Sequence, residues 1–267
     1  HLHNIHGYFI NYPALFKFLD AENIPVVWTL HDCWPFTGHC SYFSDIRCTK
    51  WQTQCQHCPK LSSYPASLWV DRSYENFNQK RQFFEAPHNI TMVAVSDWLC
   101  EIIKESFLGN MPLRKISNGI DLDTFAPRLD NSEIRSKYGV KKRYMILGVA
   151  SVWDRRKGYD DYIRLAGALS DDYDLVLVGL TPKQISYLPN NVTGIKRTED
   201  LNELSALYSS ADIVLNLSNQ ETFGLTTVEG FACGTPGIVY NCTASPELIT
   251  HQTGLVVEER NIQDLTQ

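Results

Sequence analysis

The sequence contains no long hydrophobic run and no excess of basic residues. Its longest apolar stretches, such as DLVLVG at residues 174–179, have the length of a strand and fall well short of the roughly 20 residues that a membrane-spanning helix needs. The 267 residues include 24 Lys and Arg against 30 Asp and Glu, which gives a net charge of −6 at pH 7. A broad nucleic-acid surface requires excess positive charge, so we expect no nucleic-acid partner. A small phosphate site needs only a few local cations and a helix N-terminus, so the net charge does not exclude such a site.

The sequence also lacks an initiating methionine. It begins at His1, in what has the pattern of a strand end, and it stops at Gln267, where a helix is expected to begin. We therefore interpret the chain as a fragment without either end of the natural protein. Any targeting segment would then lie in the missing part.

Strands and helices alternate along the chain. In the first block we expect helices at 12–21 and 97–107 and strands at 23–30, 89–95 and 115–118. After a linker at 119–142 we expect strands at 144–150, 175–179, 213–217 and 237–240, and helices at 159–170, 202–210 and 227–233. Such alternation predicts an α/β protein whose parallel sheets are covered by helices on both faces. We expect two domains, residues 1–120 and 121–267, with the strand ends of their sheets facing a cleft.

The most informative segment is residues 218–236, SNQETFGLTTVEGFACGTP. An expected strand leads to Glu221, a tight turn at Gly224 follows, and a helix carries Glu229. The free N–H groups and the dipole at the start of this helix favour a phosphate. Ionised carboxylates only accept hydrogen bonds, so Glu221 and Glu229 suit the hydroxyls of a sugar and a ribose.

This segment resembles the Glu-x7-Glu signature of GT-B glycosyltransferases, in particular glycosyltransferase family 4. Four further segments are similar to motifs of that family in order and spacing: VAVSDWLCEII (93–103), KISNGIDLDTF (115–125), DRRKG (154–158) and SALYSSADIVLNLS (205–218). The resemblance covers nearly the whole chain. It implies a GT-B fold of two Rossmann-like domains, with an incomplete acceptor-side domain at 1–120 and a nucleotide-sugar donor domain at 121–267.

The resemblance also implies roles for individual residues of the donor domain. Glu229 would hold the ribose hydroxyls of the nucleotide, and Glu221 would contact the hydroxyls of the donor sugar. The backbone between these two residues would touch the sugar and the diphosphate, with contributions from Phe223, Gly224, Leu225 and Thr226. Taken alone, Glu229 on an amphipathic helix would more often be a solvated surface charge.

Three basic residues and one histidine complete the expected site. Lys157, with Arg156 or Arg155, would neutralise the leaving diphosphate. The family commonly has an Arg several residues before this Lys, and the matching place here is near Ser151, so the chain departs from the usual pattern. His31 matches a position whose His faces the donor sugar, although alone it could equally be a buried residue at a strand end.

The family implies an activity. The protein would be a retaining glycosyltransferase that moves a sugar from a nucleoside-diphosphate sugar to a glycan or a lipid-linked acceptor, without a catalytic metal or other cofactor. Such enzymes build cell-surface polysaccharides, so we expect a cytoplasmic location with peripheral contact at the inner membrane face. A nucleotide-sugar epimerase of GT-B fold, a non-catalytic sugar-nucleotide-binding module and a zinc-organised interaction module remain as alternatives.

The segment 33–65 is rich in Cys, Trp, His and Pro and has no regular period. It holds five of the eight cysteines, and four of them, Cys40, Cys48, Cys55 and Cys58, form a cluster downstream of Cys33. The Cys-x2-Cys spacing of the last pair is typical of a structural zinc site, and four thiolates would complete a tetrahedron, although the first pair is spaced too widely for a standard knuckle. Two disulfides or four unlinked thiols are the alternatives.

Overall fold

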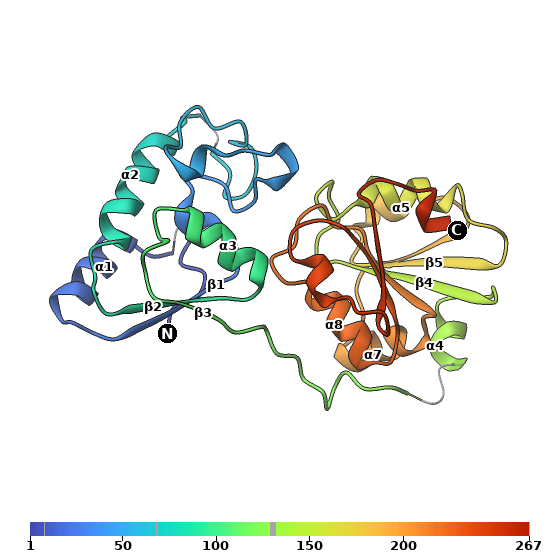
Figure 1. Cartoon of the computed structure of the whole chain (residues 1–267). Coiled ribbons are helices and arrows are strands. Elements are labelled where there is room, and N and C mark those ends of the chain that lie inside the picture. Colours follow the sequence, from blue (N-terminus) through green and yellow to red (C-terminus); the bar gives the residue numbers. More distant parts are fainter. Residues whose placement is uncertain (8, 68, 129–131, 267) are drawn as a thin grey trace. The chain divides into compact units, whose positions relative to one another are not determined.

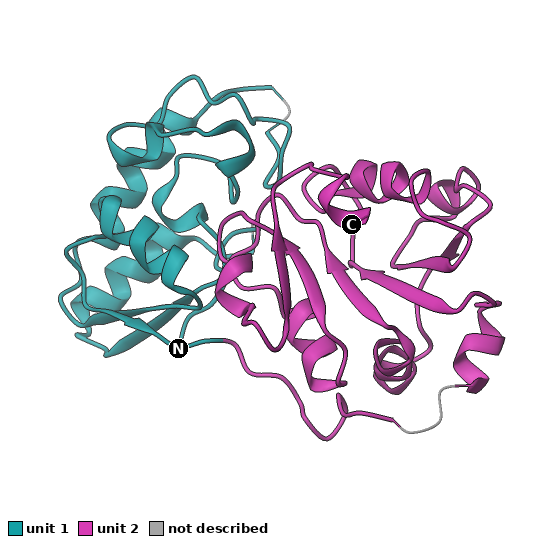
Figure 2. Ribbon diagram, turned by 45° about the vertical axis from the view of Figure 1, so that its right-hand side comes forward, with its two compact units in different colours: residues 1–117 teal, residues 118–267 magenta. Residues whose placement is uncertain are grey.

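A computed structural model describes residues 1–7, 9–67, 69–128 and 132–266 of the chain (Figure 1). The chain divides into two compact units, His1–Ser117 and Asn118–Gln267 (Figure 2). Each unit contains its own parallel sheet, which confirms the predicted α/β class. Within the described ranges no helix combines the length and the apolar character that crossing a membrane requires.

The first unit is built on a three-stranded sheet in the order β1-β2-β3. Its strands are β1 (Val26–Leu30), β2 (Ile90–Ala94) and β3 (Leu113–Lys115), and its helices are α1 (Tyr12–Ala21), α2 (Ser73–Phe84) and α3 (Asp97–Glu105). The side chain of Asn11 caps α1, and that of Ser96 caps α3. Phe16, Trp28 and Phe84 pack their rings together and so fix α1 and α2 against the sheet.

The second unit contains a six-stranded parallel sheet in the order β6-β5-β4-β7-β8-β9. Its strands are β4 (Tyr144–Val149), β5 (Tyr173–Val178), β6 (Val192–Ile195), β7 (Ile213–Asn216), β8 (Gly237–Tyr240) and β9 (Gly254–Val257). Its helices are α4 (Ser132–Lys137), α5 (Tyr159–Ala166), α6 (Pro182–Ile185), α7 (Leu201–Ser210) and α8 (Leu225–Ala232). The chain builds outward from β4 in one direction and then from β7 in the other. The carboxyl ends of these two neighbouring strands therefore mark the switch point, where such sheets bind ligands.

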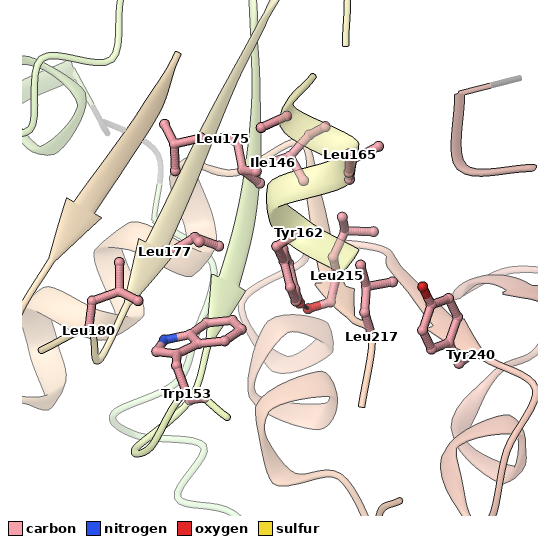
Figure 3. Close-up of a cluster of buried hydrophobic side chains, with 13 residues drawn as sticks. Ile146, Trp153, Tyr162, Leu165, Leu175, Leu177, Leu180, Leu215, Leu217 and Tyr240 are labelled. Atoms are coloured by element: carbon pink, nitrogen blue, oxygen red, sulfur yellow. Dashed lines mark hydrogen bonds between the residues drawn. The ribbon is translucent and has the colours of Figure 1, made fainter. Parts of the chain in front are cut away.

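Alternate residues of each central strand point to opposite faces of this sheet. On one face Ile146, Leu177 and Leu215 pack against Tyr162 of α5 (Figure 3). On the other face Leu147 and neighbouring strand residues pack against α7 and α8. Because both faces are covered, the strands are nearly continuous apolar runs, as is typical of parallel sheets.

Candidate functional site

The predicted donor residues lie on two loops that leave neighbouring strands at the switch point. Residues 154–158 follow β4, and residues 217–224 follow β7, which is paired with β4. Parallel strands end at the same edge of a sheet, so the two loops emerge side by side. The order of the strands therefore explains why residues more than 60 positions apart in the sequence belong to one site.

The first loop is packed directly onto the end of β7. Gly158 has a φ of +73°, and a Cβ atom at this position would lie 2.1 Å from the carbonyl oxygen of Leu217. Only glycine tolerates both this conformation and this approach. Asn219 then joins the loops, because its backbone N–H donates to the Arg156 carbonyl at 2.8 Å and its side-chain amide donates to the Arg155 carbonyl at 3.0 Å.

This packing brings Lys157 to Glu221. Their Nζ and Oε1 atoms are 2.5 Å apart, and both side chains are mostly buried. The Lys157 backbone N–H donates to Asp154, and the Glu221 backbone N–H donates to the Thr243 hydroxyl. An ammonium and a carboxylate are thus held at the switch point in fixed positions, each anchored through its own backbone.

The turn after Glu221 leads into a helix whose start is open to a ligand. Gly224 has φ 103° and ψ 57° and precedes α8, and no side chain caps this end. The N–H groups of the first helical turn have no partner within a helix, so those of Leu225 and Thr226 are suited to an anion. Phe223 is buried, whereas Leu225 is exposed, so Phe223 can meet a ligand only through its backbone.

Glu229 lies one turn further along α8 and is half-buried. Its Oε2 accepts a hydrogen bond of 2.8 Å from the hydroxyl of Tyr208, a buried residue of α7. Burial raises the pKa of the Glu229 carboxyl above its ordinary value, and the bond from Tyr208 opposes this only in part. The second acid of the pair is therefore more readily protonated than a surface glutamate.

The remaining predicted residues are placed less tightly. Arg155 is exposed, and the Arg156 guanidinium approaches the Gln220 carbonyl at 3.5 Å. His31 belongs to the other unit, directly after β1, where its Nε2 lies 2.9 Å from Nδ1 of His3. Burial, and then the neighbouring His3, lower the pKa of His31. Its role towards a donor sugar stays a prediction.

The expected zinc site is not supported. Cys40, Cys48, Cys55 and Cys58 do line one small cavity of about 20 Å³, and all four are free thiols. Yet among the described residues no three His, Cys, Asp or Glu side chains are grouped as a metal ion requires. Instead Cys40 and Cys58 share a hydrogen bond, which raises the pKa of Cys40 and lowers that of Cys58 to about 7. The assignment of a metal to these four cysteines stays a prediction.

Three residues that support the site were not foreseen: Tyr208, Thr243 and Asn219. Tyr208 and Thr243 reach the two glutamates from segments 21 and 22 residues away in the sequence. No local pattern marks them, since their roles depend on how α7 and the end of β8 pack. Asn219 stands within the signature segment, and its polar side chain directly after a buried strand is the one signal that could have been used.

The family of the chain follows from comparison with known proteins. The family model for glycosyl transferases group 1 matches residues 130–267, which contain both loops of the site. The chain belongs to this family. Over 281 aligned residues it is 27% identical to the glycosyl transferase WcaC of Escherichia coli K12, which is named for colanic acid biosynthesis; the match covers 100% of this chain and 65% of WcaC.

A second group 1 relative is a GDP-mannose-dependent α-(1-6)-phosphatidylinositol dimannoside mannosyltransferase of Mycobacterium tuberculosis. It is 33% identical over 153 residues, which are 53% of this chain and 39% of that protein. The chain thus spans less than two thirds of the length of either relative.

Solved structures confirm the fold. The structure of Anabaena HepE in complex with UDP has a TM-score of 0.67 and 19% sequence identity to this chain, and the match covers 95% of this chain and 64% of HepE. Sucrose-phosphate synthase from Thermosynechococcus elongatus has a TM-score of 0.63 and 22% sequence identity, and the match covers 95% of this chain and 66% of the synthase. These neighbours are GT-B glycosyltransferases, which agrees with the predicted fold class.

The contact between Gly158 and β7 can be tested by substitution. We expect Gly158→Ala to destabilise the second unit by at least about 2 kcal/mol, because a positive φ costs roughly 1–3 kcal/mol and the new Cβ collides with Leu217. In a unit of this size the melting temperature should fall by roughly 5 °C or more. Gly139→Ala is the matched control, since Gly139 also has a positive φ but nothing lies within 4 Å of its Cβ position. Equal melting temperatures for the two variants would contradict the close approach.

Proposed function

We propose that this chain forms part of a retaining glycosyltransferase that transfers a sugar from a nucleoside-diphosphate sugar to a glycan or lipid-linked acceptor in cell-surface polysaccharide synthesis. The observation that carries the proposal is the pairing of Lys157 with Glu221 beside the uncapped start of α8. Membership of group 1 and the activities for which the relatives are named support it.

The chemistry of the site suits a sugar nucleotide. When the nucleoside diphosphate departs, negative charge develops on its β-phosphate. This charge would be stabilised by Lys157, by one of Arg155 and Arg156, and by the backbone amides at the start of α8. The protein already holds these groups in place, so they would not need to reorganise. Glu221 would then accept hydrogen bonds from hydroxyls of the sugar, and Glu229 from those of the ribose.

Three finer parts of the proposal rest on the family resemblance. These are retention of the anomeric configuration, the absence of a catalytic metal, and a cytoplasmic location at the inner membrane face. His31 would face the donor sugar. Thermal shift of the full-length protein with UDP-, GDP- and ADP-sugars separates these donors, since a specific ligand raises stability by mass action.

The role of Glu229 predicts a dependence of donor binding on pH. A carboxylate accepts ribose hydroxyls only when it is ionised, and burial raises its pKa. The affinity for a sugar nucleotide should therefore fall as the pH is lowered from 7.5 towards 5.5, where the charge of the diphosphate diester is constant. Calorimetric titration should show that Glu229→Gln binds more weakly at pH 7.5 and has lost this dependence. If the donor affinity of Glu229→Gln fell with pH as steeply as that of the unsubstituted protein, the assignment would be rejected.

The role of Lys157 predicts an effect on turnover. We expect Lys157→Gln to lower kcat about 100- to 1000-fold, as loss of one preorganised donor to a developing charge commonly does. The donor dissociation constant should change much less. Lys183→Gln is the matched control, because Lys183 is exposed on α6. Product analysis with a labelled donor distinguishes transfer from epimerisation, and binding without any turnover would indicate a non-catalytic module.

A further inference from the structure

The first unit contains a cavity of about 300 Å³ that the donor chemistry does not use. It lies beyond the carboxyl end of β1, where the chain turns into the short helix Trp34–Phe36. Residues of α1 and α2 supply further walls, and the two bordering segments contribute Ile5, His6, Gly7 and Ile10, and Pro65, Ser67 and Val70. In open parallel sheets this end of the strands is the usual place for a ligand.

One face of α2 gives this cavity its polar character. Arg72, Asn76 and Lys80 all line it, and they are spaced four residues apart, so they form a single stripe on the helix. Two of the three are cationic, and no carboxylate belongs to the described lining. In a chain whose net charge is −6, this is a local reversal of sign.

Lys80 is almost completely buried. Its Nζ donates to the carbonyl oxygens of Trp34 at 2.7 Å and Thr37 at 2.9 Å, and it lies 3.5 Å from the centroid of the Trp34 ring. These neighbours are acceptors or a π face, all of which favour an ammonium. Burial lowers the pKa of Lys80, so an anion in the cavity would stabilise its charged form.

The nearest carboxylates are already engaged elsewhere. Asp32 accepts from His6 Nε2 at 2.7 Å and from the Trp34 backbone at 2.9 Å. Asp71 accepts from the backbone N–H groups of Cys58 and Ser73. Arg72, in contrast, is exposed and has no carboxylate within 4 Å among the described residues. Its guanidinium therefore remains available to a ligand.

The segments that border the cavity also expose large apolar side chains. Trp69 is 92% exposed, Phe9 69% and Val70 61%, whereas Ile10 and Val70 also line the cavity. The segment that contains His6 lies against the segment that begins at Tyr64, since the Tyr64 hydroxyl is 3.2 Å from Nδ1 of His6. A cationic cavity bordered by exposed apolar groups matches a ligand that is anionic at one end and apolar at the other.

We propose that this cavity binds a phosphate group carried by the acceptor, with Arg72 and Asn76 as its direct contacts and Lys80 as the buried charge behind them. A phosphate suits this set because it offers several acceptor oxygens to a guanidinium and an amide at once. The exposed apolar side chains favour a lipid as the carrier of the phosphate. The proposal rests on the transferase function, since it names the acceptor chemistry of that reaction.

Fluorine NMR of the chain labelled with 5-fluorotryptophan can test this proposal. Trp34 lines the cavity, and Trp153 is the single tryptophan of residues 118–267, so the two resonances report on separate units once Trp34→Phe and Trp153→Phe have assigned them. The probes are methyl phosphate and dihexanoylphosphatidic acid, added with UDP or GDP present to fill the donor site. Methyl glucoside and dihexanoylglycerol are the neutral counterparts.

We expect the Trp34 resonance to shift saturably with a phosphate probe and not with the neutral ones. Arg72→Gln should weaken this binding at least tenfold, whereas Arg81→Gln, on the same helix but paired with Glu85, should change it less than twofold. Tighter binding of the phosphatidic acid than of methyl phosphate, lost in Trp69→Ser, would identify a lipid as the carrier of the phosphate. Equal affinity for the two probes would identify a soluble carrier. No response of Trp34 to either phosphate, or equal affinities in the two arginine variants, would overturn the proposal. A Trp153 resonance that does not shift when UDP or GDP is added would instead contradict the donor function.

Discussion

The site depends on the contact between the loop after β4 and the carbonyl end of β7. Gly158 approaches Leu217 so closely that no side chain fits between them, and Asn219 fastens the same loop through two hydrogen bonds. Without this contact Lys157 and Glu221 would be two charges on independent loops. With it they form a mostly buried pair, in which desolvation makes correct placement necessary.

The sheet order explains why this contact occurs where it does. The chain leaves β4 for one half of the sheet and returns at β7 for the other, so the loops after these two strands meet at the switch point, where such sheets bind ligands. An open helix start and a glycine turn then add backbone amides to the ammonium. The result is a place for an anion flanked by two carboxylates, one anchored by Thr243 and the other by Tyr208.

The sequence predicted those parts that depend on local chemistry. The helix at 12–21 was predictable because its apolar residues recur at helical spacing, and the segment from Glu221 to Glu229 because strand, turn and helix follow one another within a few residues. Helix α2 was missed because few of its residues are apolar and one buried position is Lys80, whose partners are carbonyl groups distant in the sequence. The short strands β6 and β9 were also missed, since four residues carry little periodicity. The cysteine spacing marked four residues that line one cavity, but a metal site also depends on the directions of the thiols, which spacing does not determine.

The bonds that hold the two donor loops together, as described above, join residues between Asp154 and Thr243. All of them lie inside the second compact unit, and the group 1 family model matches nearly the same stretch of chain. The half that contains the Lys157–Glu221 pair is consequently self-sufficient in its construction. Under the proposed function, changes in the first unit would leave these bonds intact, so a different acceptor would not require the donor site to be rebuilt.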